Sequence, residues 1–188
     1  MNGETSAKTW LVLVFQFPKG AGSQRVRIWR RLQGIGAIAI KSSVYVLPAN
    51  EQCQEDFEWL LTELAAAGAE ATLLESKLIT GLDDAQLREL FIEARNKDYV
   101  ALEEDIENIR VGIADDTNVT PEALQTMRQA HRRARKRMAD IEAIDFFGAN
   151  GQETAQAALW ALEERLAAHE SPESEGNLVK QQPEVNDL

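Results

Sequence analysis

One segment constrains the fold more than any other part of the sequence: Arg25 to Pro48, which reads RVRIWRRLQGIGAIAIKSSVYVLP. Its first half has the pattern of a basic amphipathic helix, and the glycines of GIG end that helix. Two short apolar stretches, AIAI and SVYVL, then predict two strands that meet at Ser42 and Ser43. A helix followed directly by two short strands indicates a domain of mixed α and β structure.

This predicted helix has two different faces. At about 100° per residue, one face is expected to pack against the protein and the other to carry charge. The packing face holds Arg25, Ile28, Trp29, Leu32 and Gly36, and the charged face holds Arg27, Arg30 and Arg31.

The flanking sequence supplies the remaining strands and a second helix. The continuous apolar run TWLVLVFQF, residues 9–17, predicts a central strand covered on both faces. Asn50 is the expected N-cap of a second helix, and AEATLLESK predicts a fourth strand. The core positions of that helix are Phe57, Leu60, Leu61 and Leu64. The resulting order, β-α-β-β-α-β, is that of the ferredoxin-like fold, an antiparallel sheet with two helices on one face.

Beyond residue 80 the apolar periodicity is wholly helical. Asp83 with Gln86 predicts the start of a third helix, Thr120 with Pro121 the start of a fourth, and Asn150 with Gly151 a break before a fifth. The expected apolar stripes are Leu87, Leu90, Phe91, Ala94, Leu102, Ile106, Ile109 and Ile113 on the third helix, Leu124, Met127, Ala134, Met138 and Ile141 on the fourth, and Ala158, Leu159, Leu162 and Leu166 on the fifth.

These patterns predict an α+β protein in three parts. A ferredoxin-like α/β domain is expected over residues 9–80 and a three-helix C-terminal annex, packed on it, over residues 81–169. The acidic, polar residues 170–188 have little apolar surface to bury, so we expect a disordered tail.

The net charge of −11 argues against a protein that coats nucleic acid indiscriminately, but positive charge is concentrated in residues 1–50 and 127–147. The single cysteine suits a reducing cytoplasm, where we expect the protein to reside. The apolar run at residues 10–17 is too short to span a bilayer, so no membrane association is expected.

The densest basic cluster is HRRARKR, which lies on the fourth helix. If the apolar stripe packs, its cations spread over the rest of the helix: Arg132, Arg133, Arg135, Lys136 and Arg137. One interpretation is a surface that binds phosphate or another oxyanion, for which guanidinium groups are well suited. The alternative is a solvated face paired with the acidic third helix, at Glu103, Glu104, Asp105 and Glu107. Arg27, Arg30 and Arg31 of the first helix carry the same two interpretations. No helix-turn-helix pattern is evident.

The sequence offers little for catalysis. His131 and His169 are expected on the surface, and neither has a nucleophile or carboxylate at diagnostic spacing. Cys53 is expected to be a small packing residue, although the start of its helix would favour the thiolate. The phenylalanines of DFF, Asp145 to Phe147, are expected to pack the last helices onto the core. No metal site, catalytic residue or cofactor site is predicted.

Five segments occur in the order WLVLVFQFP, RVRIWRRLQGIGA, SVYVLP, FEWLLTEL with a glycine just after it, and IEAIDFF. Together they resemble the N-terminal region of the ChrB chromate-resistance regulator family, from about Trp10 to about Leu166. The front half also resembles the ferredoxin-like module of PaaX-type transcriptional repressors and of small CRISPR-associated endonucleases.

Two departures from these families matter. The CRISPR nucleases carry a metal-binding aspartate at the end of the first strand, whereas Val14 to Pro18 contain no acidic residue, so metal-dependent cleavage by that mechanism is not expected. ChrB proteins of full length continue into a second domain with no counterpart in this sequence. Chromate sensing is therefore expected here only if it does not require that domain.

The resemblance implies a cytoplasmic regulator that binds DNA upstream of chromate or related stress genes. DNA would be held by Arg27, Arg30, Arg31 and the Arg132 to Arg137 cluster, with chromate as the candidate oxyanion effector. Family analogy favours a homodimer. The alternative is a non-catalytic protein-interaction module that works with a separately encoded partner of the ChrB C-terminal type. An enzyme acting on chromate or nucleic acid ranks last, because no catalytic constellation is visible.

Overall fold

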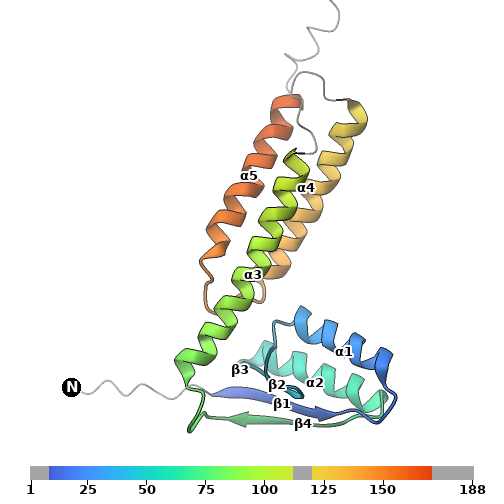
Figure 1. Cartoon of the computed structure of the whole chain (residues 1–188), viewed down its shortest axis with the longest axis vertical. Coiled ribbons are helices and arrows are strands. Elements are labelled where there is room, and N and C mark those ends of the chain that lie inside the picture. The colour runs from blue at the N-terminus through green and yellow to red at the C-terminus, as the bar shows by residue number, and fades with distance from the viewer. Residues whose placement is uncertain (1–8, 112–119, 171–188) are drawn as a thin grey trace, which may run out of the picture. The chain divides into compact units, whose positions relative to one another are not determined.

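The computed structural model describes residues 9–111 and 120–170 (Figure 1). These residues form an α+β structure with a four-stranded antiparallel sheet and five helices. The elements are β1 (Trp10–Gln16), α1 (Gly22–Gly34), β2 (Ile38–Lys41), β3 (Val44–Pro48), α2 (Glu51–Ala66), β4 (Glu70–Ser76), α3 (Asp84–Val111), α4 (Pro121–Glu142) and α5 (Gly151–Glu170). The predicted combination of an antiparallel sheet with helices is confirmed.

The chain divides into two compact units. The sheet unit runs to Asn96, so it includes the start of α3, and it is completed by Asp140–Ala149. The helical unit consists of the described residues within Lys97–Ala139 and those from Asn150 to Glu170. Helices α3 and α4 therefore contribute residues to both units, and each unit is described by itself below.

In the sheet unit the strand order is β2-β3-β1-β4, and every neighbouring pair is antiparallel. Leu13 at the centre of β1 lies opposite Tyr45 of β3 and Leu73 of β4. Helices α1 and α2 lie side by side on one face of the sheet (Figure 1). The core between them contains Leu11, Leu13, Phe15, Ile28, Leu32, Leu47, Phe57, Leu60 and Leu64.

The second face of β1 differs from its prediction. Trp10 is buried there because Phe91 stacks on its ring at 5.9 Å and Phe147 contacts it at 6.0 Å. Towards the end of the strand, Val14 is 38% exposed and Gln16 is exposed. The prediction of a strand covered on both faces is therefore wrong for its second half, because Phe91 and Phe147 cover only the first half of this face.

The predicted helix starts are confirmed. Asn50 Oδ1 accepts a hydrogen bond of 2.8 Å from the backbone N–H of Cys53. Asp83 and Gln86 form a reciprocal capping box, with bonds of 2.8 and 3.0 Å. Thr120 caps α4 by accepting from the N–H of Ala123 at 3.2 Å. Each cap satisfies donors that the first helical turn leaves without partners.

The packing face of α1 is narrower than predicted. Ile28 and Leu32, one turn apart, are buried, but Trp29 is 52% exposed and Arg25 is also exposed. Gly36 lies beyond the helix, where it is buried at a φ of +73°. Of the predicted packing face, only Ile28 and Leu32 are helical residues that pack into the core.

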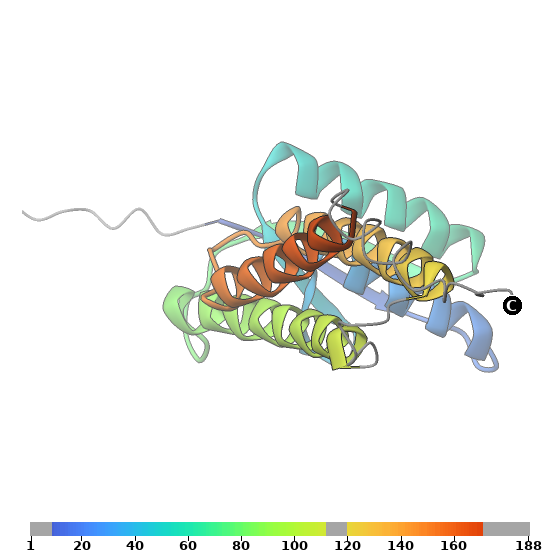
Figure 2. The same cartoon turned by 90° about the horizontal axis from the view of Figure 1, so that it is seen from above.

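In the helical unit, α4, α5 and the later part of α3 run alongside one another (Figure 2). The predicted stripes face inward, with Leu102, Ile106, Met127, Ala134, Met138, Leu159, Leu162 and Leu166 all buried. Ile113 of the predicted third stripe and residues 171–188 of the predicted tail lie outside the described residues, and Glu170 belongs to α5.

His131 corrects another prediction. It is only 8% exposed, in contrast to the surface position predicted for it. It follows Met127 by one helical turn and precedes Ala134 by three residues, so it falls on the buried stripe of α4. In the sequence, His131 looks like part of a solvent-exposed basic run because arginines follow it directly.

Candidate functional site

The most strongly basic surface of the helical unit is on α4. Because the apolar stripe of this helix packs inward, the charged side chains point outward. Arg132, Arg133, Arg135 and Lys136 are exposed, and Arg137 is partly exposed. We call these five residues the α4 cluster.

The acidic residues of α3 neutralise this cluster only in part. Arg137 Nη1 forms an ion pair with Asp105, as the interpretation of a paired face predicts. Glu107 instead binds Arg110 of its own helix at 2.8 Å, and this hydrogen bond lowers the pKa of Glu107. Among the described residues, no ion pair joins the four exposed cations of the cluster to a carboxylate. Most of the charge of the α4 cluster is therefore available to an external anion.

A shallow hollow of about 290 Å³ lies between α3 and α4 within the helical unit. Arg133 and Arg137 line it together with Asp105, and its apolar wall comes from Leu102, Ile109, Ala130 and Ala134. Two guanidinium groups beside one carboxylate offer the hydrogen-bond donors that a tetrahedral oxyanion or a phosphate group requires.

The basic face of α1, in the sheet unit, is partly neutralised. Arg27 Nη2 lies 3.2 Å from Glu63 Oε2, and Arg31 Nε lies 3.3 Å from Glu63 Oε1. The two arginines are one helical turn apart and both face α2, which is why one carboxylate reaches both. Arg30 is exposed and takes no part in these pairs. The predicted cationic face is present, but two of its three arginines share a glutamate that no sequence pattern identifies as their partner.

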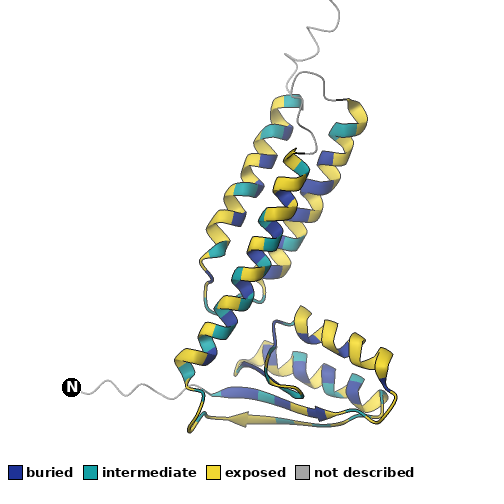
Figure 3. Ribbon diagram, in the orientation of Figure 1, coloured by how far each residue is buried: buried dark blue, intermediate teal, exposed yellow. Residues whose placement is uncertain are grey.

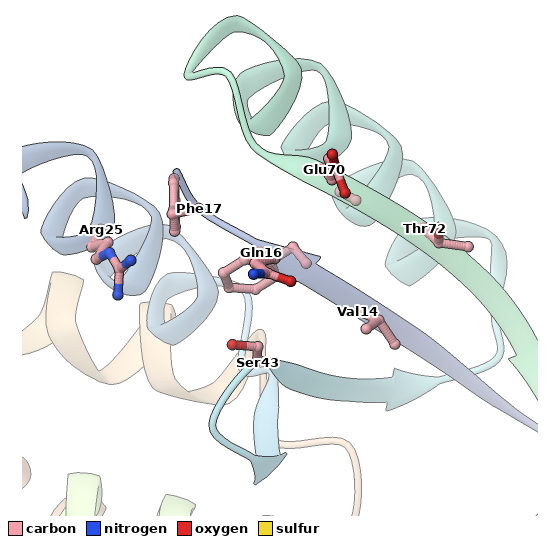
Figure 4. Close-up of a pocket in the computed structure, with 9 residues that line it drawn as sticks. Val14, Gln16, Phe17, Arg25, Ser43, Glu70 and Thr72 are labelled. Atoms are coloured by element: carbon pink, nitrogen blue, oxygen red, sulfur yellow. The ribbon is translucent and has the colours of Figure 1, made fainter. Parts of the chain in front are cut away.

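A second feature of the sheet unit was not predicted. A hollow of about 820 Å³ opens at the end of β1, where the sheet is uncovered (Figure 4). Arg25 lines it, with its guanidinium 5.5 Å from the ring centre of Phe17. Further polar groups come from Gln16, Ser43, Glu70 and Thr72. Sequence reasoning missed this hollow because only the fold brings together its two strands, β1 and β4, with α1 and the turn between β2 and β3.

Among the described residues, the possible metal ligands are scattered and the cysteine is buried. The structure contains no group of three or more histidine, cysteine, aspartate or glutamate side chains, within these residues, that could hold a metal ion. Cys53 is buried, and this burial raises the pKa of its thiol, outweighing the hydrogen bond from Asn50. Cys53 is therefore a packing residue, as expected.

The aromatic residues near the end of α4 are structural. Phe146 and Phe147 pack against the core of the sheet unit and contact Phe91 edge-on, at 5.9 and 5.4 Å. Asp145 accepts hydrogen bonds from the N–H groups of Gly148 and Ala149. The packing role predicted for the two phenylalanines is confirmed.

In the described part of the chain, every helix is too short or too polar to cross a bilayer.

Comparisons with known proteins place this chain among its relatives. A family model described as "Protein ChrB, N-terminal" matches residues 25–172. Protein ChrB of Cupriavidus metallidurans is 26% identical over 180 residues, which cover 93% of this chain and 52% of that protein. The chain thus spans about half the length of this curated relative.

Proposed function

The chain belongs to the ChrB family, whose N-terminal region it matches, and on this premise we propose that it is a non-catalytic, DNA-binding regulator linked to chromate resistance. Its place of action under this proposal is the cytoplasm. The contacts to DNA are made by the α4 cluster, with a contribution from Arg27, Arg30 and Arg31 of α1.

One observation carries this proposal: four exposed cations lie within little more than one turn of α4 without a described carboxylate partner. Contacts between arginine and phosphate supply much of the affinity of proteins for DNA. On a chain of net charge −11, a surface of this kind is local, so binding is confined to one region. Selectivity for a base sequence would require further contacts.

We assign the sheet and its two covering helices to the ferredoxin-like fold. The support is the strand order β2-β3-β1-β4 with antiparallel neighbours, joined in the sequence β-α-β-β-α-β. Helices α3, α4 and α5 form the C-terminal annex of this assignment.

Chromate is the proposed effector of the DNA complex. It is a tetrahedral dianion, and Arg133 and Arg137 line one hollow in a position to donate hydrogen bonds to such an ion. Phosphate oxygens of DNA would compete for the same donors, so chromate binding there would weaken the DNA complex.

The test is fluorescence anisotropy of the purified chain with DNA from upstream of its own gene, against a scrambled duplex, across a range of salt concentrations. Selective binding that chromate releases, but equimolar sulfate does not, supports the full proposal. Binding that is equal for both duplexes limits the function to non-selective contact. No binding to either duplex at low salt overturns the proposal.

A second candidate function is an interaction module for a separately encoded partner of the ChrB C-terminal type. Trp59 on the outer side of α2 is 71% exposed and lines a groove of about 430 Å³ with Arg27, Ile28 and Glu63. Exposed tryptophan is enriched at protein interfaces. Titration calorimetry with such a partner, expressed separately, would show binding that Trp59→Ala weakens. A heat signal that this substitution leaves unchanged would exclude the groove.

A further inference from the structure

The two edges of the sheet differ in how they are protected. Strand β2, at one edge, has four residues, ends at Lys41 and shifts register between Ala39 and Lys41. Strand β4, at the other edge, has seven residues, EATLLES, all in unbroken register with β1. Short length, lysine and irregular register are devices that stop a sheet edge from pairing with another chain. All three occur at β2, whereas β4 is longer and regular, and its charged residues are two glutamates, Glu70 and Glu75.

The outer side of β4 is accessible for pairing. It is the last strand in the sheet order, so its backbone N–H and C=O groups on that side have no strand partner in the described sheet. Five of its seven residues are exposed, and most of this strand is yellow in Figure 3. Leu74 is 48% exposed and Val14, on the adjacent strand, is 38% exposed. The edge therefore combines free backbone groups with exposed apolar side chains.

The sequence of β4 is compatible with its own copy in antiparallel register. With Leu73 on the two-fold axis, Glu70 lies opposite Ser76 and Glu75 lies opposite Ala71, so no two carboxylates face each other. Thr72 lies opposite Leu74 in this register. The Leu74 side chains of the two copies become diagonal neighbours on one face, which shields apolar surface that is exposed in a single copy.

We propose that a second copy of this chain pairs antiparallel along β4, in the register centred on Leu73, to form a continuous eight-stranded sheet. A two-fold axis through this residue closes the assembly at two copies, because each chain offers one such edge. Pairing through one strand buries a small area, so the dimer is expected to be weak and to depend on concentration. This proposal does not rest on the proposed function, since no DNA takes part.

The first test is sedimentation equilibrium of the whole chain at about 1 to 100 μM, the range in which weak interfaces dissociate. The double variant Thr72→Lys and Leu74→Lys places lysine directly opposite lysine at both pairs. Both positions are exposed, so the fold is expected to persist. The dimer dissociation constant should rise by about tenfold or more. The matched control, Ala39→Lys with Ser42→Lys, adds the same charge at and beside β2, where both residues are exposed, and should leave the constant unchanged.

The second test fixes the register. Thr72→Cys with Leu74→Cys places a cysteine opposite a cysteine in each pair, and mild oxidation should give a covalent dimer. Thr72→Cys alone, which faces leucine, should give much less. A chain that stays monomeric over the whole range, or a dimer that the lysine pair does not weaken, would overturn the proposal. A dimer with equal cross-linking from the single and double cysteine variants would overturn the register.

Discussion

The indole N–H of Trp10, the first residue of β1, donates a hydrogen bond of 2.7 Å to Asp84 Oδ1, in the first residue of α3. The ring of Trp10 stacks on Phe91, two turns further along the same helix. These contacts attach the start of α3 to the central strand. The sheet unit therefore includes the start of α3 as well as the four strands and the two helices that cover them. Trp10 has both an aromatic contact and a polar partner.

We expect this hydrogen bond to contribute to folding. Asp84→Ala leaves the buried indole N–H without its acceptor, which costs about 1 to 3 kcal/mol in the free energy of unfolding. Trp10→Phe keeps an aromatic ring and removes the donor. Urea denaturation of both single variants and of the double variant measures their coupling, expected at about 0.5 kcal/mol or more. Additive effects of the two substitutions would show that the bond contributes nothing.

Gly36 should not tolerate alanine. Its φ is +73°, and a Cβ there would lie 2.8 Å from Cβ of Ile144. Gly68 is a matched control, since its φ is +72° and a Cβ there would meet nothing within 4 Å. Gly68→Ala should cost about 1 to 2 kcal/mol, the conformational cost alone. Gly36→Ala should cost about 1 to 3 kcal/mol more from overpacking. Equal losses in thermal unfolding would mean that the segment around Ile144 moves aside freely.

The elements of this fold were predictable because their signals are local. Asn50 and Thr120 predict helix starts, because each side chain accepts a hydrogen bond from a backbone N–H only three residues further along the chain. Burial was less predictable, because it depends on what packs across from each residue. Trp29 has the apolar character of a core residue but lies beside the buried stripe of α1. His131 lies on the buried stripe of α4 despite its basic neighbours.

The candidate site was predictable only as a set of cations. The sequence shows where arginine is concentrated on α1 and α4, but it does not show which arginines already have a carboxylate. Glu63 is 32 positions or more from the arginines it binds, and no pattern in the chain links them. The hollow that Arg25 lines is likewise a product of the fold.

Stability should fall at alkaline pH. Burial raises the pKa of Cys53 above its ordinary 9.0 and the pKa of Tyr45 above its ordinary 10.0. In the unfolded chain these groups ionise first, so their contribution to stability is fully present below pH 9 and declines as the pH rises past those ordinary values. Urea unfolding at pH 7 and pH 10 measures the decline. Cys53→Ala with Tyr45→Phe should reduce it, and an unchanged decline would assign it to other groups.

The proposed DNA-binding role of α4 predicts a change in salt dependence. Each cation that neutralises a phosphate contributes about 0.9 to the slope of log K against log salt concentration. Replacing Arg132, Arg133 and Arg135 with glutamine should lower that slope by about 0.9 for each of these arginines that binds a phosphate, with the circular dichroism spectrum unchanged. Arg110→Gln is the control, because Arg110 is already held by Glu107. A triple variant with the slope of the parent chain would remove the α4 cluster from the interface.

Glu63→Gln tests whether α1 takes part. The substitution keeps the size of the side chain and releases Arg27 and Arg31 from their shared carboxylate. Both arginines are well exposed, so breaking these pairs should cost about 0 to 1 kcal/mol in stability. If α1 contacts DNA, the released guanidinium groups bind phosphate, and the affinity rises most at low salt with a steeper slope.

The control for the added charge is Glu58→Gln on the same helix, where the glutamate accepts a hydrogen bond from Gln54 and no arginine pair is present among the described residues. Both variants make the chain less negative by one unit, so a long-range effect of charge would raise the affinity equally. A gain that is larger for Glu63→Gln identifies Arg27 and Arg31 as direct contacts. Equal gains would confine the DNA-binding surface to the helical unit, and α1 would then be a packing helix whose arginines serve only to join it to α2.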